Sequence, residues 1–140
     1  MPTARVLCVE DDADTRELLK LLLGYSDFEA VVAPDADAAL RLMRGERFSL
    51  YVLDGGLRGA RGLSLCEQIR ASDDRTPIII FSGDAAPADI KAGMFAGANA
   101  YLVKPDSSEL VPTIRRLLQS SRGEESRPAL PNQLTLAQNY

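Results

Sequence analysis

Residues 49–63 read SLYVLDGGLRGARGL, and this stretch decides the fold that we predict for the chain. It contains a short apolar run, LYVL at residues 50–53, which has the length and composition of a buried strand. The run ends in Asp54, and Gly55 and Gly56 follow at once. A carboxylate at this point of an α/β sheet lies where such sheets bind ligands, although a helix cap or an Asp-Gly turn would give the same pattern. The residues that follow the other strands decide between these interpretations.

Apolar runs alternate with segments of helical period along the chain. The runs are apolar throughout rather than alternately apolar and polar, which indicates a parallel sheet with helices on both faces. The sequence therefore predicts a doubly wound α/β fold with five strands and five helices. Strands are predicted at residues 5–9, 28–33, 49–54, 78–81 and 99–103, and helices at 14–25, 35–45, 63–72, 87–97 and about 108–118.

The first predicted helix has apolar residues on two neighbouring faces. Leu18, Leu22 and Tyr25 share one helical face, and Leu19 and Leu23 lie beside it.

The composition restricts the chemistry that the chain can perform. With 140 residues and a formal net charge of −4, it has room for one core and no basic surface for nucleic acid or an anionic membrane. It contains no histidine, which excludes imidazole-based triads and zinc sites with histidine ligands. Cys8 and Cys66 are isolated rather than part of a disulfide framework, which is typical of free thiols in a reducing cytoplasm. No apolar run is long enough to cross a membrane. We expect a cytoplasmic protein that uses carboxylates, hydroxyls, lysine and a hard metal ion.

The composition changes near residue 120. Residues 121–140 are rich in Ser, Gln, Asn, Pro and charged residues, which is typical of a flexible segment. We therefore expect one domain over residues 1–120 and a flexible C-terminal tail or linker over 121–140. This segment has no room for a DNA-binding or catalytic domain, so we expect no direct nucleic-acid binding by the chain. The chain either acts alone through protein contacts or precedes a further domain of a longer protein.

Polar side chains follow four of the five predicted strands. Because the carboxyl ends of parallel strands meet at one edge of a sheet, we expect these side chains to lie together. Three clustered carboxylates need a counter-charge, and oxygen ligands select Mg²⁺ or Mn²⁺. With a lysine and a hydroxyl beside them, they form a site for a small tetrahedral anion near a metal, in which one carboxylate is free to act as a nucleophile. The residues are Glu10 and Asp11 after the first strand, Asp54 after the third, Ser82 after the fourth and Lys104 after the fifth.

Four segments together resemble the receiver domain of the two-component response regulator family. They are VEDD at residues 9–12, LDGGLRGARGL at 53–63, PIIIFSG at 77–83 and AGANAYLVKP at 96–105. Each segment alone is a weak signal, but their order and spacing are specific, and the resemblance covers about residues 4–120. It implies a flavodoxin-like sheet with strand order 2-1-3-4-5.

The resemblance also implies roles for the acidic residues. Asp54 is the implied phosphoacceptor, and Mg²⁺ is held by Asp11, Asp54 and the backbone carbonyl of Gly56. Glu10 acts mainly through a metal-bound water. Asp12 is expected to be a helix cap rather than a metal ligand.

Further implied roles concern the fourth and fifth strands. Lys104 pairs with a phosphoryl oxygen, and the peptide bond before Pro105 is cis. Ser82 moves to hydrogen-bond the phosphoryl group, and Tyr101 follows from an outward to an inward rotamer, which alters the face of the fourth helix, fifth strand and fifth helix. The implied partners are a sensor histidine kinase or histidine phosphotransfer protein as donor, and a downstream protein target or effector domain as recipient.

Four positions depart from the family pattern. Arg58 stands where proline is usual, and Asp106 stands where an aromatic residue commonly follows Lys-Pro. Gly56 offers no side chain to shield an acyl phosphate, and Asp84 adds a carboxylate at the rim of the site. These departures affect the expected lifetime of the phosphoryl group and the partner face.

Two alternative functions remain beside the switch. An interaction-only pseudo-receiver is disfavoured because every member of the site is present. An aspartyl-phosphate phosphatase of the haloacid dehalogenase type places a second acid two residues after the nucleophile, where this chain has Gly56. We therefore predict a signalling domain that catalyses only its own phosphoryl transfer and dephosphorylation.

Overall fold

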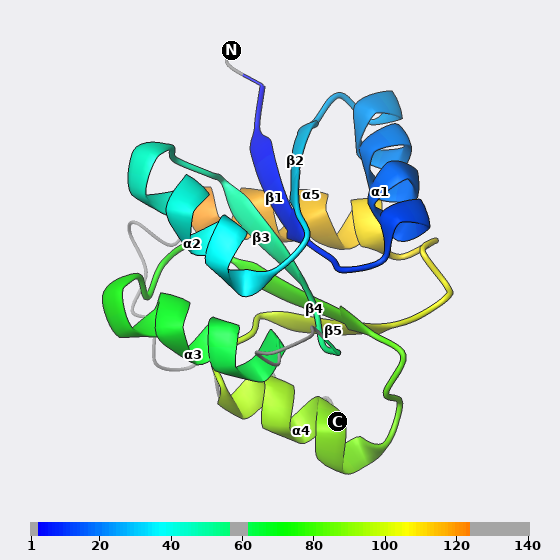
Figure 1. Cartoon of the computed structure of the whole chain (residues 1–140), viewed down its shortest axis with the longest axis vertical. Helices are drawn as coiled ribbons and strands as arrows, with labels where there is room; N and C mark the ends of the chain where they lie inside the picture. The colour runs from blue at the N-terminus through cyan, green and yellow to red at the C-terminus, as the bar shows by residue number, and fades with distance from the viewer. Residues whose placement is uncertain (1–2, 57–61, 124–140) are drawn as a thin grey trace.

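The computed structural model describes residues 3–56 and 62–123, which form five strands and five helices in alternation (Figure 1). The strands are β1 (Arg5–Val9), β2 (Glu29–Ala33), β3 (Leu50–Asp54), β4 (Ile78–Ser82) and β5 (Ala100–Val103). The helices are α1 (Ala13–Tyr25), α2 (Ala36–Gly45), α3 (Gly62–Ser72), α4 (Pro87–Phe95) and α5 (Leu110–Gly123). Every predicted strand and helix is present.

The five strands are parallel and lie in the order β2-β1-β3-β4-β5. This order confirms the flavodoxin-like, doubly wound fold. It places the carboxyl ends of β1, β3 and β4 side by side, with β5 next to β4 at one edge of the sheet. Ligands of open parallel sheets bind at this end of the strands.

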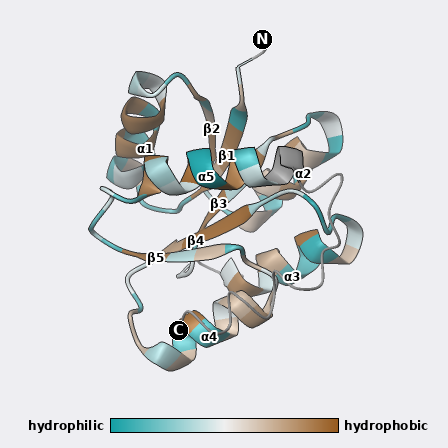
Figure 2. Ribbon diagram, turned by 180° about the vertical axis from the view of Figure 1, so that it is seen from behind, coloured by the Kyte–Doolittle hydropathy of each residue, from teal (hydrophilic) through white to brown (hydrophobic). Residues whose placement is uncertain are grey.

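Helices cover both faces of the sheet, as Figures 1 and 2 show. One buried cluster joins the sheet to α1 and α5, and a second joins it to α2 and α3. Alternate residues of a strand enter opposite clusters: Cys8 faces the first cluster and Leu7 the second. Since both faces are covered, every residue of β3 and β4 is buried, which explains why these strands are apolar up to their last residues, Asp54 and Ser82.

The buried face of α1 is the one formed by Leu19 and Leu23. Their side chains are 1% and 0% exposed, whereas Leu18 is 48% and Tyr25 is 88% exposed. Leu22 is partly buried and packs against the same cluster. The face formed by Leu18, Leu22 and Tyr25 therefore points largely to solvent. The sequence did not distinguish the two faces, because leucines lie on both.

The C-terminal boundary predicted at residue 120 falls within α5, which continues to Gly123. Residues 124–140 of the predicted tail lie outside the described residues, and so does Arg58. Within the described part of the chain, no helix has the length and apolar character needed to span a bilayer.

Candidate functional site

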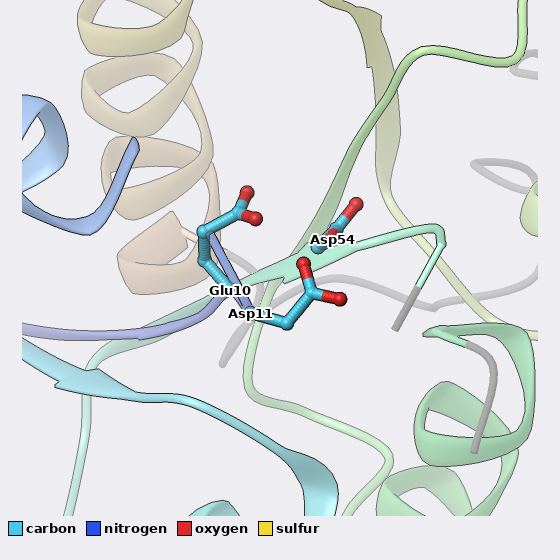
Figure 3. A group of neighbouring side chains, drawn as sticks. All are labelled: Glu10, Asp11 and Asp54. Carbon is cyan, nitrogen blue, oxygen red and sulfur yellow. The ribbon is translucent and has the colours of Figure 1, made fainter. Parts of the chain in front are cut away.

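Three carboxylates meet at the carboxyl end of the sheet (Figure 3). Glu10 and Asp11 follow β1, Asp54 ends β3, and one oxygen from each carboxylate lies within 4.8 Å of the other two. The strand register explains this meeting: Val9 pairs with Leu53, so the residues that follow them stand next to each other. Glu10 and Asp54 are only 2% and 7% exposed.

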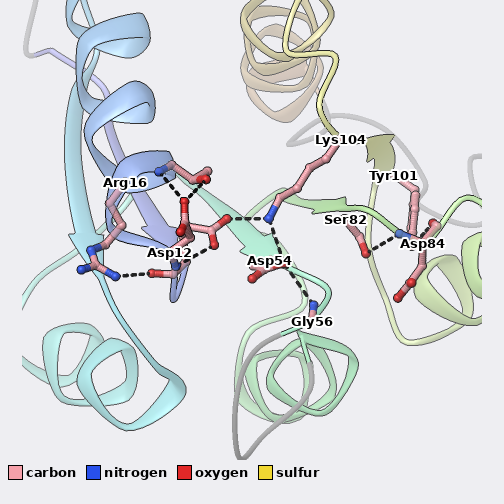
Figure 4. A network of polar contacts seen from close by, with 10 residues as sticks. Asp12, Arg16, Asp54, Gly56, Ser82, Asp84, Tyr101 and Lys104 are labelled. Atoms are coloured by element: carbon pink, nitrogen blue, oxygen red, sulfur yellow. Dashed lines mark hydrogen bonds and ion pairs between the residues drawn. The ribbon is translucent and has the colours of Figure 1, made fainter.

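Lys104 reaches these acids from the end of β5 (Figure 4). Its Nζ donates to Glu10 Oε1 at 2.7 Å and to Asp54 Oδ1 at 3.1 Å. Burial lowers the pKa of Lys104, but these two bonds and the negative charges of Glu10 and Asp54 together outweigh burial and raise that pKa. The ammonium therefore provides a fixed positive charge beside Asp54. The Lys104–Pro105 peptide bond is cis, as the resemblance implied.

Glu10 is the most buried of the three acids. Burial raises the pKa of its carboxyl, while the Lys104 ammonium and the backbone N–H of Asp12 oppose that rise. The Arg16 guanidinium donates to the backbone carbonyl of Glu10 at 3.0 Å and so ties the first helix to this loop. Asp12 caps α1, as predicted, by accepting from the backbone N–H of Thr15 at 2.9 Å.

Glycines bring neighbouring segments unusually close to Asp54. The backbone N–H of Gly56 donates to Asp54 Oδ1 at 3.1 Å. A Cβ on Gly55 would lie 2.5 Å from Ser82 Oγ, and a Cβ on Gly62 would overlap the backbone carbonyl oxygen of Asp54. The sequence predicted a flexible turn at Gly55 and Gly56 and a metal-binding carbonyl at Gly56, but it did not reveal the close contacts that Gly55 and Gly62 permit.

Ser82 and Tyr101 are connected through the loop between β4 and α4 (Figure 4). The Ser82 hydroxyl oxygen accepts from the backbone N–H of Asp84 at 3.1 Å, and the Tyr101 hydroxyl donates to the Asp84 carbonyl at 2.7 Å. Ser82 is 1% exposed, and the Tyr101 ring packs against Gly93 of α4 and Ile80 of β4. Tyr101 thus occupies an inward position.

A cleft of about 470 Å³ lies beside these side chains, and Gly55, Gly56, Ser82, Asp84 and Tyr101 are among its lining residues. It gives solvent access to the end of the sheet next to Asp54. The exposed Asp84 stands at its rim, as expected.

The remaining predicted departure, Asp106, forms a turn of its own. Its carboxylate accepts from the backbone N–H of Ser108 at 3.0 Å and from the Ser108 hydroxyl at 2.6 Å. These bonds lower the pKa of Asp106.

The donor atoms of the cluster fit a hard divalent cation. Glu10, Asp11 and Asp54 offer only oxygen, the ligand type that Mg²⁺ and Mn²⁺ prefer. The cluster brings three carboxylates together beside the single ammonium of Lys104, so it keeps a net negative charge that suits a cation.

The family is shown by a model of the response regulator receiver domain, which matches residues 6–115. The chain therefore belongs to the receiver domain family of two-component response regulators. Transcriptional regulatory protein CseB of Streptomyces avermitilis is 38% identical over 128 residues, covering 89% of this chain and 54% of that protein. Response regulator MprA of Mycobacterium tuberculosis is 31% identical over 129 residues, covering 91% and 56%. The chain thus spans about half the length of the curated relatives that it matches.

Solved structures show the same similarity. A CheY-like receiver domain protein from Methanospirillum hungatei has a TM-score of 0.82 at 27% identity, covering 88% of this chain and 99% of that one. Response regulator TrrA from Thermotoga maritima, solved in complex with Mg²⁺ and BeF, has a TM-score of 0.75 at 28% identity, covering 82% and 99%.

Proposed function

We propose that this chain is a phosphorylation-dependent signalling switch in which Asp54 accepts a phosphoryl group. The observation that supports this most directly is the Lys104 ammonium, which lies 3.1 Å from Asp54 Oδ1 within the cluster that Asp54 forms with Glu10 and Asp11. The Asp54 carboxylate is thus next to both a fixed cation and the oxygen donors that could hold a metal. Family membership gives independent support.

The transfer moves a phosphoryl group from a phosphohistidine of a partner to an oxygen of Asp54. The new O–P bond forms as the P–N bond to imidazole breaks, and imidazole leaves. Because the chain contains no histidine, the donor is another protein, either a sensor histidine kinase or a histidine phosphotransfer protein. The Lys104 ammonium binds a phosphoryl oxygen, and Ser82 donates its hydroxyl hydrogen to another.

Mg²⁺, or Mn²⁺ in its place, would be held by Asp11, Asp54 and the backbone carbonyl of Gly56, with Glu10 acting through a water. When bound, the metal supplies positive charge that neutralises the phosphoryl oxygens.

The response passes from Ser82 to Tyr101 through Asp84. A phosphoryl group on Asp54 attracts the Ser82 hydroxyl, and the loop that Ser82 contacts holds Tyr101 in its inward rotamer. The two rotamers of Tyr101 present different surfaces on α4, β5 and α5. A new dianion can bias such a two-state element through charge-assisted hydrogen bonds.

The recipient of the signal is a protein target or an effector domain. The domain extends through α5, within which the predicted boundary at residue 120 falls, and it functions in the cytoplasm. It catalyses only its own phosphoryl transfer and dephosphorylation and does not bind nucleic acid itself. The negative net charge of −4 supports the last point.

The test is incubation with Mg²⁺ and acetyl phosphate, followed by measurement of the intact mass. We expect the wild-type protein to gain one phosphoryl group and Asp54→Ala to gain none. Asp14→Ala, on the exposed first turn of α1, removes a carboxylate that does not belong to the cluster and should gain the group normally. A folded wild-type protein without an adduct would instead indicate a pseudo-receiver, and rapid multiple turnover would indicate a phosphatase.

A further inference from the structure

Gly55 and Ser82 meet in a space that only one side chain can occupy. Asp54 pairs with Phe81 in the register of β3 and β4, so the next residues of the two segments are neighbours. A Cβ on Gly55 would lie 2.5 Å from Ser82 Oγ and 2.6 Å from Ser82 Cβ. Carbon atoms in favourable contact are about 3.5–4.0 Å apart, so the Ser82 side chain already fills the position that a Cβ would take.

Rotation of the Ser82 side chain cannot resolve this overlap. Rotation moves Oγ, whereas Cβ is fixed to the backbone of β4. The Ser82 backbone is itself held, because its carbonyl accepts from the backbone N–H of Lys104 at 2.8 Å. A side chain at residue 55 would therefore force the turn after Asp54 and the end of β4 apart by roughly an ångström.

Backbone conformation does not explain the glycine at this position. Over residues 3–56 and 62–123, Gly97 is the glycine with a positive φ, 118°. Alanine could therefore adopt the backbone of Gly55 without left-handed strain. Contact with Ser82 is what a Cβ at residue 55 would change.

We infer that Gly55 is a positioning residue: its missing side chain allows Ser82 to stand close enough to Asp54 for the Ser82 hydroxyl to reach a phosphoryl group there. This inference rests on the proposed function. It adds that residue 55 sets the separation between Asp54 and its phosphoryl-binding hydroxyl. A displacement of this size is enough to remove a directed interaction in a reacting site.

The test is a titration with beryllofluoride and Mg²⁺, a phosphoryl mimic, followed by amide NMR signals of Ser82 and Gly83. We expect Gly55→Ala and Ser82→Ala each to weaken binding about tenfold or more, the loss of one hydrogen bond to a charged group. The double variant should bind no more weakly than Ser82→Ala, because both changes remove the same bond. Gly83→Ala is the matched control, since a Cβ on Gly83 meets no atom within 4 Å. Its affinity should remain within about twofold of wild type.

Thermal unfolding tests the contact separately, including the case in which Gly55→Ala folds poorly. Ser82→Gly removes both overlapping atoms, so Gly55→Ala should lower the melting temperature much less in the Ser82→Gly background. An equal cost in both backgrounds would overturn the inference. It would also be overturned by unchanged beryllofluoride affinity in Gly55→Ala, or by losses that multiply in the double variant with Ser82→Ala. Absence of binding by the folded wild-type protein would overturn the proposed function, and the inference with it.

Discussion

Lys104 and Glu10 lie 94 residues apart in the chain, yet Lys104 Nζ is 2.7 Å from Glu10 Oε1. The pair joins the end of β5 to the end of β1 across the ends of β3 and β4. Its side chains are largely withdrawn from solvent, at 23% exposure for Lys104 and 3% for Glu10. The same ammonium bonds to Asp54, so one cation neutralises charge from two acids.

Lys104→Met should destabilise the domain, because Glu10 and Asp54 would remain buried without their cation. The free energy of unfolding should fall by about 2 kcal/mol or more. Mg²⁺ should restore much of this loss, since it binds the same acids only in the folded state. Urea unfolding with and without MgCl₂ measures both effects.

Lys91→Met is the matched control for that change, because Lys91 is exposed on α4. Equal stability of the two variants would contradict a stabilising role for the Lys104 ammonium.

Gly62→Ala should lower the free energy of unfolding by about 1–3 kcal/mol. The added Cβ would overlap the Asp54 carbonyl, and neither atom can rotate away because both are fixed to the backbone. Gly24→Ala in α1 is the comparison, since a Cβ there meets nothing within 4 Å. It should leave stability unchanged or raise it by about 0.5–1 kcal/mol, the helix preference of alanine over glycine. Chemical denaturation measures both free energies of unfolding, and equal values for the two variants would contradict the close contact at Gly62.

Leu19→Ala and Leu18→Ala test which face of α1 is buried. Leu19 is 1% exposed, so its truncation should leave a cavity and cost about 3 kcal/mol of unfolding free energy. Leu18 is 48% exposed, and its truncation should cost less than about 1 kcal/mol. If Leu18→Ala had the lower denaturation midpoint of the two, the buried face of α1 would instead be the one that contains Leu18, Leu22 and Tyr25.

Asp73→Ala should have an effect that depends on pH. Burial alone would raise the pKa of Asp73, but its bonds to Thr76 and Arg75 outweigh burial and lower that pKa. The resulting stabilisation is present above the ordinary aspartate pKa of about 3.9 and is lost as pH falls through the lower folded-state value. At neutral pH the variant should be less stable by about 1 kcal/mol, and this difference should shrink in strong acid.

Denaturation of wild type and Asp73→Ala across this pH range provides the measurement. Asp74→Ala, at the exposed neighbouring residue, should change stability by less than about 0.5 kcal/mol. A difference for Asp73→Ala that stays constant with pH would show that its charge is not responsible.

The fold could be predicted because its main determinants are local in the sequence. Each strand is a short apolar run, and each helix has its own period, so the α/β alternation follows from the pattern alone. The grouping of Glu10, Asp54 and Lys104 could also be predicted, because residues that follow parallel strands must meet at one edge of the sheet. The strand order itself came from family resemblance rather than from the residues.

Other features depend on how distant segments approach each other in space. The contact of Gly55 with Ser82 and that of Gly62 with Asp54 depend on the path of the turn after β3, which glycine spacing does not specify. The bond from Tyr101 to the Asp84 carbonyl likewise depends on the conformation of the loop after β4. The buried face of α1 is selected by its neighbours in the fold.

Because β5 is the last strand in the sequence, Lys104 is absent from chains that end early. A fragment that ended before residue 100 would still contain Glu10, Asp11 and Asp54, but not the ammonium that bonds to two of them. During synthesis on the ribosome, the acids therefore emerge long before their cation does. A fragment that ends before residue 100 should therefore bind a second fragment that contains β5 and Lys104, because the second fragment supplies both the last strand and the missing positive charge.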